Sequence, residues 1–273
     1  PAVTTASTVK TGVGVTSDPC PEVIGGIPTG ADPSKGCIYL GLLNDYTGPF
    51  GPYGIPLETG QRGFWLWANQ SGGIGDYSVA IIEGYDTQYN PQKHLEGYKA
   101  IRDEVAALAM SLGTPQTQFI LDDMDADNMI AAPMSWYSGW SYKSSDRGLV
   151  VEFGAAYCAD GMNAVDWAMA NLPVDIKTIG VMGYAGDYGG DYAAGIRVAA
   201  EANGIEVAWE YIVPSTEFDV AQAVGLMVTK PVDAYFPAIG PTFMAQVAGG
   251  AFQQGLTPIA MMAAPSYLSL IHI

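Results

Sequence analysis

The residues of this chain that could do chemistry are hydroxyl, aromatic and glycine residues placed directly after runs of apolar residues. The clearest case is residues 113–118, Gly-Thr-Pro-Gln-Thr-Gln, which follow the apolar run 105–112 and precede Phe-Ile-Leu at 119–121. The pattern predicts a turn between the end of a buried strand and the start of a helix, where backbone N–H groups and hydroxyls point outward. Such a turn suits reversible binding of a small polar ligand, although an ordinary capped turn has the same pattern.

Five further segments share this composition and also follow predicted strands: residues 45–49, 134–137, 187–189, 239–242 and 264–266. In an open α/β sheet, ligands bind at the carboxyl ends of the strands. These segments therefore predict a ligand cleft lined by aromatic rings for packing and by hydroxyl or backbone groups for orientation.

Motifs for catalysis or metal binding are missing from the sequence. There is no G-x-S-x-G elbow, no GxxxxGK[ST] phosphate loop, no G-x-G-x-x-G after the first predicted strand and no CxxC pair. His94 lies in a polar helical segment, so a surface position is expected for it. The acids at 122, 123, 125 and 127 lack the glycine and final glutamate of a calcium loop, and a solvated helix end is expected instead. We predict no enzyme activity, no cofactor and no metal.

Composition and charge limit the possible partners. The 273 residues are 49% hydrophobic and 14% charged, and the formal net charge is −17. A chain this acidic is repelled by phosphate backbones, so no nucleic-acid partner is expected. No apolar run approaches the roughly 18 residues that span a bilayer, and residues 1–5 lack the features of a secretory signal, so we expect a mature or clipped form.

Two of the three cysteines, Cys20 and Cys37, bracket a segment rich in proline and glycine. A disulfide across such a loop is useful only in an oxidising compartment, and a pair of reduced thiols is the alternative. Cys158 is expected to be a core or helix-start cysteine.

The elements that must position these residues alternate along the chain. Strands are predicted at 38–43, 77–85, 105–112, 128–132, 148–153, 178–182, 205–213, 232–239 and 258–263, and helices at 57–69, from 90, at 116–124, 159–171, 191–203, 220–229 and 242–254. Alternating strands and helices predict parallel sheets built from βαβ units. There are too many strands for one small sheet, so the predicted fold class is α/β with two doubly wound, Rossmann-like lobes.

The sequence also predicts how the chain divides into a surface segment, two lobes and a truncated C-terminal end. Residues 1–36 are expected to be a tether or surface wrap, 37–153 the first lobe, 154–258 the second lobe and 259–267 a strand returning to the first lobe. Residues 268–273 resemble a translated adapter sequence, so we expect them to be an artefact and the protein to be truncated.

Several motifs in order resemble the type I periplasmic solute-binding proteins of branched-chain amino acid (Leu/Ile/Val) ABC transporters, in particular actinobacterial ones. They are Leu-Asn-Asp-Tyr-Thr-Gly-Pro at 43–49, Asn-Gln-Ser-Gly-Gly-Ile at 69–74, the segment 84–91 and Gly-Asp-Tyr-Gly at 186–189. The likeness extends over residues 37–266. It implies a periplasmic binding protein type I fold that closes two lobes over a small solute and passes it to a membrane permease.

The resemblance also implies roles for single residues. Thr114, with Pro115 beside it, falls where the family has a ligand-binding serine, and Ser135 and Trp136 fall in the loop that grips the ligand carboxylate. The remaining implied ligand-binding residues are Tyr46 in the first loop, Tyr188 as the aromatic that closes over the ligand from the second lobe, Ile239 or Gly240, and Ser266. Thr114 and Tyr188 are expected to face each other across the cleft.

The ligand class is left open by one mismatch. No acid stands near Ser266 to bind an α-amino group, so the ligand could be an amino acid, a related amide, an aromatic acid or another small carboxylate. An enzyme on a doubly wound scaffold and a ligand-sensing ectodomain are the alternative functions. We expect an extracytoplasmic, monomeric protein with a small solute and an ABC permease as partners.

Overall fold

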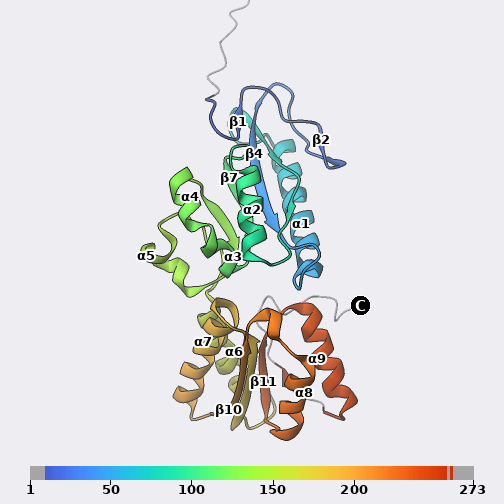
Figure 1. Ribbon diagram of the computed structural model, residues 1–273, viewed down its shortest axis with the longest axis vertical. Coiled ribbons are helices and arrows are strands. Elements are labelled where there is room, and N and C mark those ends of the chain that lie inside the picture. The colour runs from blue at the N-terminus through green and yellow to red at the C-terminus, as the bar shows by residue number, and fades with distance from the viewer. Residues whose placement is uncertain (1–9, 257–258, 261–273) are drawn as a thin grey trace, which may run out of the picture. The chain divides into compact units, whose positions relative to one another are not determined.

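The computed structural model describes residues 10–256 and 259–260, which divide into two compact units (Figure 1). Unit 1 comprises the described residues up to Met134 together with Arg147–Val151, and unit 2 comprises Ser135–Asp146 and the described residues from Glu152 onward. The boundary expected at 153/154 lies beside the later of these crossings. The chain first enters unit 2 at Ser135 and leaves it after Asp146. No local pattern in the sequence indicated this first crossing.

Unit 1 is built around the central strand β4 (Gly36–Asn44). β4 pairs in parallel with β5 (Tyr77–Ile81), β6 (Tyr85–Asp86) and β7 (Ala107–Leu112), and β7 pairs in parallel with β8 (Ala131–Met134). The short strand β1 (Val15–Thr16) pairs with β4 in the antiparallel direction, and β2 (Val23–Ile24) forms a hairpin with β3 (Ile27–Pro28). A strand with neighbours on both edges and helices on both faces needs a nearly continuous apolar sequence, which β4 has.

The helices of unit 1 cover both faces of this sheet. Helix α1 (Gly51–Gln70) lies on one face, and α2 (Pro91–Ile101), α3 (Thr114–Phe119) and α4 (Leu121–Asp127) lie on the other (Figure 1). Asn90 caps α2 by accepting hydrogen bonds from two backbone N–H groups of its first turn, and Pro91 is the first helical residue, as the sequence predicted. The core beneath α2 is a cluster that includes Leu43, Tyr98, Leu108 and Met124.

Unit 2 is a second parallel sheet. Its strands are β9 (Thr178–Tyr184), β10 (Glu206–Val213), β11 (Ala234–Ala238) and β12 (Ile259–Ala260), in the order β10-β9-β11-β12. Helices α6 (Tyr157–Asn171) and α7 (Asp187–Asn203) pack together on one face, and α8 (Val220–Thr229) and α9 (Pro241–Gln253) on the other (Figure 1). The short helices α5 (Lys143–Asp146), η1 (Ser138–Ser141) and η2 (Ser215–Glu217) complete the unit. The two parallel α/β units confirm the predicted fold class. The expected return to the first lobe from residue 259 is wrong for the described residues Ile259–Ala260, because β12 pairs with β11 in the unit 2 sheet.

Several predicted elements have different bounds in the structure. The expected strand at 148–153 is wrong, because only one isolated bridge, from Ala131 to Val150, forms there after a left-handed Arg147–Gly148 turn. The expected helix at 116–124 is two helices that meet at Ile120. β8 starts three residues later than predicted because Asn128 adopts a left-handed conformation that ends α4.

Two other predicted elements also differ from the structure. Helix α1 begins at Gly51 rather than near residue 57, since proline is tolerated in a first helical turn and Pro52 stands there. The expected strand at 77–85 is divided into β5 and β6.

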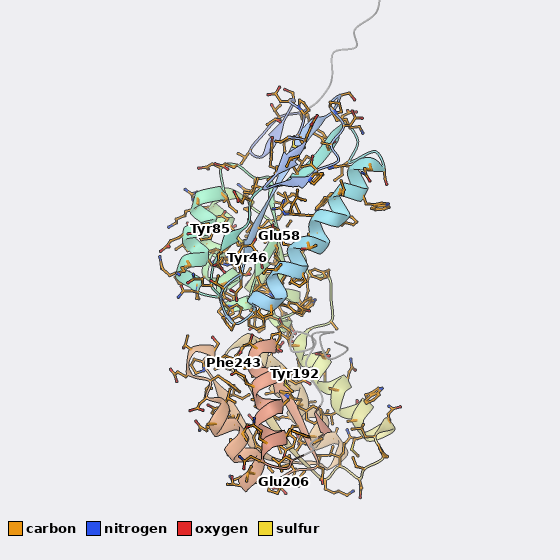
Figure 2. All side chains as sticks on the ribbon, turned by 90° about the vertical axis from the view of Figure 1, so that its right-hand side faces the viewer. Tyr46, Glu58, Tyr85, Tyr192, Glu206 and Phe243 are labelled. Carbon is orange, nitrogen blue, oxygen red and sulfur yellow. A yellow bond between two sulfur atoms is a disulfide. The ribbon has the colours of Figure 1, made fainter. Side chains whose placement is uncertain are left out.

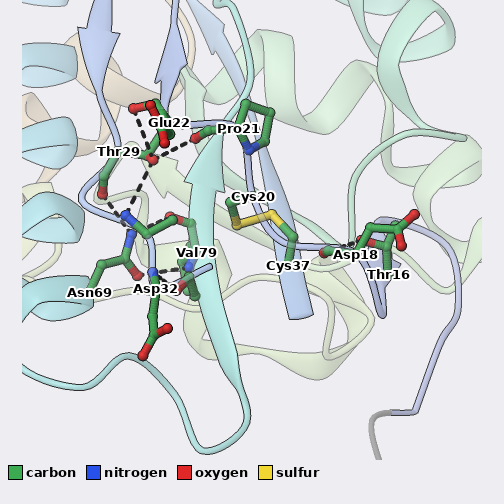
Figure 3. The surroundings of a disulfide bond; sticks show 12 residues. Thr16, Asp18, Cys20, Pro21, Glu22, Thr29, Asp32, Cys37, Asn69 and Val79 are labelled. Carbon is green, nitrogen blue, oxygen red and sulfur yellow. Dashed lines mark hydrogen bonds between the residues drawn. A yellow bond between two sulfur atoms is a disulfide. The ribbon is translucent and has the colours of Figure 1, made fainter. Parts of the chain in front are cut away.

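The segment before β4 is fastened to unit 1. Cys20 and Cys37 form a disulfide with their Cα atoms 4.8 Å apart (Figure 3). Nearby, the buried amide of Asn69 donates to the carbonyl oxygens of Thr29 and Val79 and accepts from the N–H of Val79 (Figure 3). Residues 10–35 therefore form a wrap around one side of unit 1.

Close packing of α6 against α7 gives a first testable prediction. A Cβ atom on Gly195 would lie 1.9 Å from the carbonyl oxygen of Cys158, so the two helix backbones touch there. Gly195→Ala should lower the free energy of unfolding by about 2 kcal/mol, because neither backbone can move away without loss of packing. Gly190→Ala, on the same helix with open space around its Cβ, should be neutral or stabilising. Urea denaturation measures both, and equal effects would contradict the close-contact argument.

Candidate functional site

The carboxyl ends of β4, β7 and β8 form one edge of the unit 1 sheet. Leu43 of β4 pairs with Ser111 of β7, and Leu112 of β7 pairs with Met134 of β8. Most buried polar side chains of unit 1 lie at this edge or on the elements that follow it: Asn44, Asp45, Thr87, His94, Ser111, Thr114, Gln116 and Thr117. Polar groups are rarely buried without a structural or binding role, so this edge is the candidate site of unit 1.

Thr114 is placed by the turn that Gly113 makes. Gly113 has a φ of 100°, and a Cβ on it would collide with the side chain of Gln116 and the ring of Tyr89. Only glycine fits this position, and Thr114 then begins α3 with its side chain buried. Pro115 follows in the first turn and is half-buried.

A buried hydrogen-bond chain lies beneath this turn. The His94 Nε2 atom is 2.9 Å from the Ser111 hydroxyl, which is 2.7 Å from the Thr117 hydroxyl, and Thr117 donates to the carbonyl oxygen of Gly113 at 2.8 Å. His94 is fully buried, so its expected surface position is wrong, and burial lowers its pKa to about 3. The imidazole is therefore neutral and joins α2 to the turn that carries Thr114.

Three buried polar atoms at this edge lack a protein hydrogen-bond partner among the described residues. They are the Thr87 hydroxyl, the Nδ1 atom of His94 and the amide oxygen of Gln116, whose amide nitrogen donates to the carbonyl oxygen of Tyr89 at 2.7 Å. An unpaired buried polar group costs about 1–3 kcal/mol, and such groups are common where a protein meets a ligand or an ordered water.

The loop after β4 is held by Asp45. Its buried carboxylate accepts from the backbone N–H groups of Gly48 and Phe50, the latter at 2.8 Å. Burial raises the pKa of Asp45, while these two hydrogen bonds act in the opposite direction. Asp45 thus sets the shape of the loop that includes the predicted site residue Tyr46.

The hydroxyl of Tyr46 is already engaged within unit 1. It donates to Glu58, which forms an ion pair with Arg62 at 2.7 Å, and burial raises the Tyr46 pKa. Arg62 in turn donates to the carbonyl oxygens of Ile81 and Ile82. Figure 2 shows Tyr46 and Glu58 close together between α1 and the sheet. This arrangement gives the Tyr46 side chain a structural task that the sequence did not indicate.

In unit 2, the predicted residues Ser135 and Trp136 begin a segment that is fixed from two sides. The hydroxyl of buried Ser135 accepts from the indole N–H of Trp140 at 2.9 Å. The backbone N–H and hydroxyl of Ser138 both donate to Asp191 of α7, at 2.9 and 2.8 Å. Trp136 is half-buried, and its ring lies 5.4 Å from that of Phe153.

Tyr188 occupies a different local structure from the one predicted. The expected glycine-flanked loop is only a short turn at Ala185–Gly186, and Tyr188 lies in the first turn of α7 with its ring 4.9 Å from that of Tyr157. Gly189 lies in α7, and this position needs glycine because a Cβ there would collide with the backbone of Tyr184 at the end of β9. Gly189 therefore serves close packing, and Tyr188 is buried.

Two more predicted residues, Ile239 and Gly240, lie at the carboxyl end of β11 in unit 2. Gly240 precedes α9, and its N–H donates to the buried hydroxyl of Tyr184 at 2.9 Å, while Ile239 is buried. Ser266 lies outside the described residues. Tyr184 and Phe243 also lie at this edge and were not identified as site residues from the sequence. Tyr184, two residues after the predicted strand 178–182, could have been identified from that position.

The acidic residues of α4 pair with basic side chains. Arg147 contacts Asp122 and Asp125, and Arg102 contacts Asp127 at 3.2 Å. Within residues 10–256 and 259–260, no group of three or more His, Cys, Asp or Glu side chains could hold a metal ion. None of the helices in this described part is long and apolar enough to cross a membrane.

Both units are parallel α/β sheets with polar and aromatic side chains at the carboxyl ends of their strands, which is where α/β proteins of this kind bind ligands. The chain belongs to the periplasmic binding protein family, whose model matches residues 37–272. No curated protein matches the chain.

Solved structures support this assignment. A fatty acid ABC transporter substrate-binding protein from Thermomonospora curvata is 27% identical, with a TM-score of 0.76 over 88% of this chain and 60% of that one. A branched chain amino acid ABC transporter protein from Thermus thermophilus, with bound valine, is 14% identical, with a TM-score of 0.73 over 86% of this chain and 60% of that one.

A solute binding protein from Rhodopseudomonas palustris BisB5, in complex with 3,4-dihydroxybenzoic acid, is 18% identical, with a TM-score of 0.70 over 84% of this chain and 62% of that one. The chain therefore spans about 60% of the length of these structures. The fold is that of type I periplasmic binding proteins, and the family consists of solute-binding proteins rather than enzymes.

Proposed function

We propose that this chain is the solute-binding component of an ABC importer and that its ligand is a small amino-acid-like molecule or another small carboxylate. The observation that carries the proposal is the set of buried polar groups at the carboxyl edge of unit 1, in a member of this family. The buried hydrogen bonds that join His94, Ser111 and Thr117 hold the Gly113–Thr114 turn in place, as a binding site requires.

The proposed place of work is outside the cytoplasm, with a membrane permease as partner. The Cys20–Cys37 disulfide supports this location, because disulfides persist in oxidising compartments. The branched-chain amino acid subfamily, closure of two lobes over the ligand, and the ligand contacts of Thr114, Pro115, Ser135, Trp136, Tyr188, Gly240, Ser266 and Tyr46 stay predictions.

A thermal-shift screen tests the proposal and the role of Thr114. Of valine, benzoate, 4-hydroxybenzoate and octanoate, at least one should raise Tm by about 5–10 °C at a concentration of 100 times Kd. Thr114→Val should then weaken that ligand by about 1–2 kcal/mol, roughly five- to thirtyfold, because the hydroxyl is lost while backbone donors remain. Thr59→Val on α1, whose hydroxyl bonds only within its own helix among the described residues, is the matched control. Absence of any shift across the screen would count against the importer role.

A further inference from the structure

The carboxyl edge of the unit 2 sheet carries a continuous row of aromatic rings, which we call the aromatic row. Its members are Phe153, Trp136, Tyr157, Tyr188, Tyr184, Phe218 and Phe243. Successive ring centroids are 4.9–6.4 Å apart. This spacing is the range of favourable aromatic pairs.

The row follows the edge of the sheet because of where its members stand in the elements. Tyr184 ends β9, Tyr157 begins α6, Tyr188 lies in the first turn of α7 and Phe243 in the first turn of α9. Figure 2 shows Phe243 at one end of unit 2 and Glu206, the first residue of β10, at the other. In a parallel sheet, this places the row at the carboxyl ends of the strands, where α/β proteins bind ligands.

Burial divides the row into a buried centre and an accessible rim. Tyr157, Tyr184 and Tyr188 are at most 5% exposed, so they support the row from inside. Trp136 and Phe243 are half-buried and pack on Tyr157 and Tyr184 respectively, while Phe153, the other ring neighbour of Trp136, is 59% exposed. A ligand can therefore reach these two rings without unfolding the row.

The half-buried rings already form edge-to-face pairs with their neighbours, and the aromatic ring of a ligand could form further pairs of the same kind. Trp136 meets Phe153 and Tyr157 at interplanar angles of 75° and 77°, and Phe243 meets Tyr184 at 80°. Edge-to-face packing of this kind stabilises ring pairs beyond the burial of their area. A ligand with a saturated ring of the same size would be stabilised only by the burial of its apolar surface, without the aromatic-pair contribution.

We infer that the aromatic row selects a solute with an aromatic ring, so that the ligand is a small aromatic carboxylate. The inference rests on the proposed function, and it narrows the ligand class of that same site. Trp136 and Phe243 are the two half-buried rings that the ligand ring can meet. They are separated by Tyr157, Tyr188 and Tyr184 in the row, so at least one of them contacts the ligand ring and determines specificity.

The test compares two acids that differ in aromaticity. Isothermal titration calorimetry of the chain should show that benzoate binds about two- to twelvefold more tightly than cyclohexanecarboxylate. At least one of Trp136→Leu and Phe243→Leu should reduce this ratio toward one while circular dichroism shows an intact fold. Phe252→Leu, on α9 with a side chain that is 74% exposed, is the control and should leave the ratio unchanged.

The outcomes separate this inference from the proposed function. Equal or tighter binding of cyclohexanecarboxylate, or an unchanged ratio in both folded variants, would overturn the inference. The same holds if only valine or octanoate binds, and the importer role then stands. If none of these acids binds, the proposed function itself fails.

Discussion

Replacing His94 with glutamine is expected to make the chain much less sensitive to acid. In the folded protein the buried imidazole has a pKa of about 3, against about 6.5 in an unfolded chain. Between these values the unfolded state binds a proton that the folded state does not, so stability falls as the pH falls. The contribution of neutral His94 is complete above pH 6.5 and decreases by about 1.4 kcal/mol per pH unit below it, on the order of 3 kcal/mol by pH 4.

Urea denaturation at pH 7, 5 and 4 of the wild type and His94→Gln measures this difference. Carboxylates with lowered pKa values, such as Asp86 and Asp233, contribute equally in both proteins, so the difference between the two pH curves isolates His94. The glutamine amide can still form a hydrogen bond with the Ser111 hydroxyl. The two proteins therefore differ mainly in whether residue 94 can bind a proton. Parallel pH curves would show that folding does not lower the pKa of His94.

Loss of the Cys20–Cys37 disulfide is the second large effect that we expect. The bond closes a loop with a sequence separation of 17 residues. Chain-entropy arguments give about 3 kcal/mol for a loop of this length, because the unfolded chain regains the freedom that the bond removes. The double variant Cys20→Ala/Cys37→Ala should lose about that much stability in unit 1.

Thermal denaturation with and without a reductant checks this expectation. Tm of the wild type should fall on reduction, and Tm of the double variant should not change. Cys158→Ala removes the third cysteine, which is free and lies in α6 of unit 2, and this variant should respond to reductant like the wild type. The expectation fails if reductant leaves the wild-type Tm unchanged.

Local signals predicted the elements of this protein well because their causes lie within a few residues. Asn90 and Pro91 start α2, and Gly204 ends α7 in a left-handed conformation, through hydrogen bonds with the nearest turn of the chain. The alternation of apolar strands and helices likewise predicted parallel α/β units. Where glycine or proline had two possible uses, as at Gly51–Pro52 and at Gly189, the sequence favoured a loop and the structure has a helix.

Contacts between distant segments decided what the site residues do. His94 has a polar sequence context, yet Ser111, 17 residues away, makes its burial possible. Tyr46 is tied to Glu58, and Tyr188 to Tyr157, by packing that no local pattern encodes.

The amino-acid sequence by itself determined the class of fold, the strand-end positions of the candidate residues and the pair of cysteines. Only the tertiary structure decided which of these side chains are buried, which hydroxyls are already bonded and which rings form one row. The reason is physical: helix caps and periodicity act between neighbours in the chain, whereas burial and the pKa of a side chain depend on whatever packs against it.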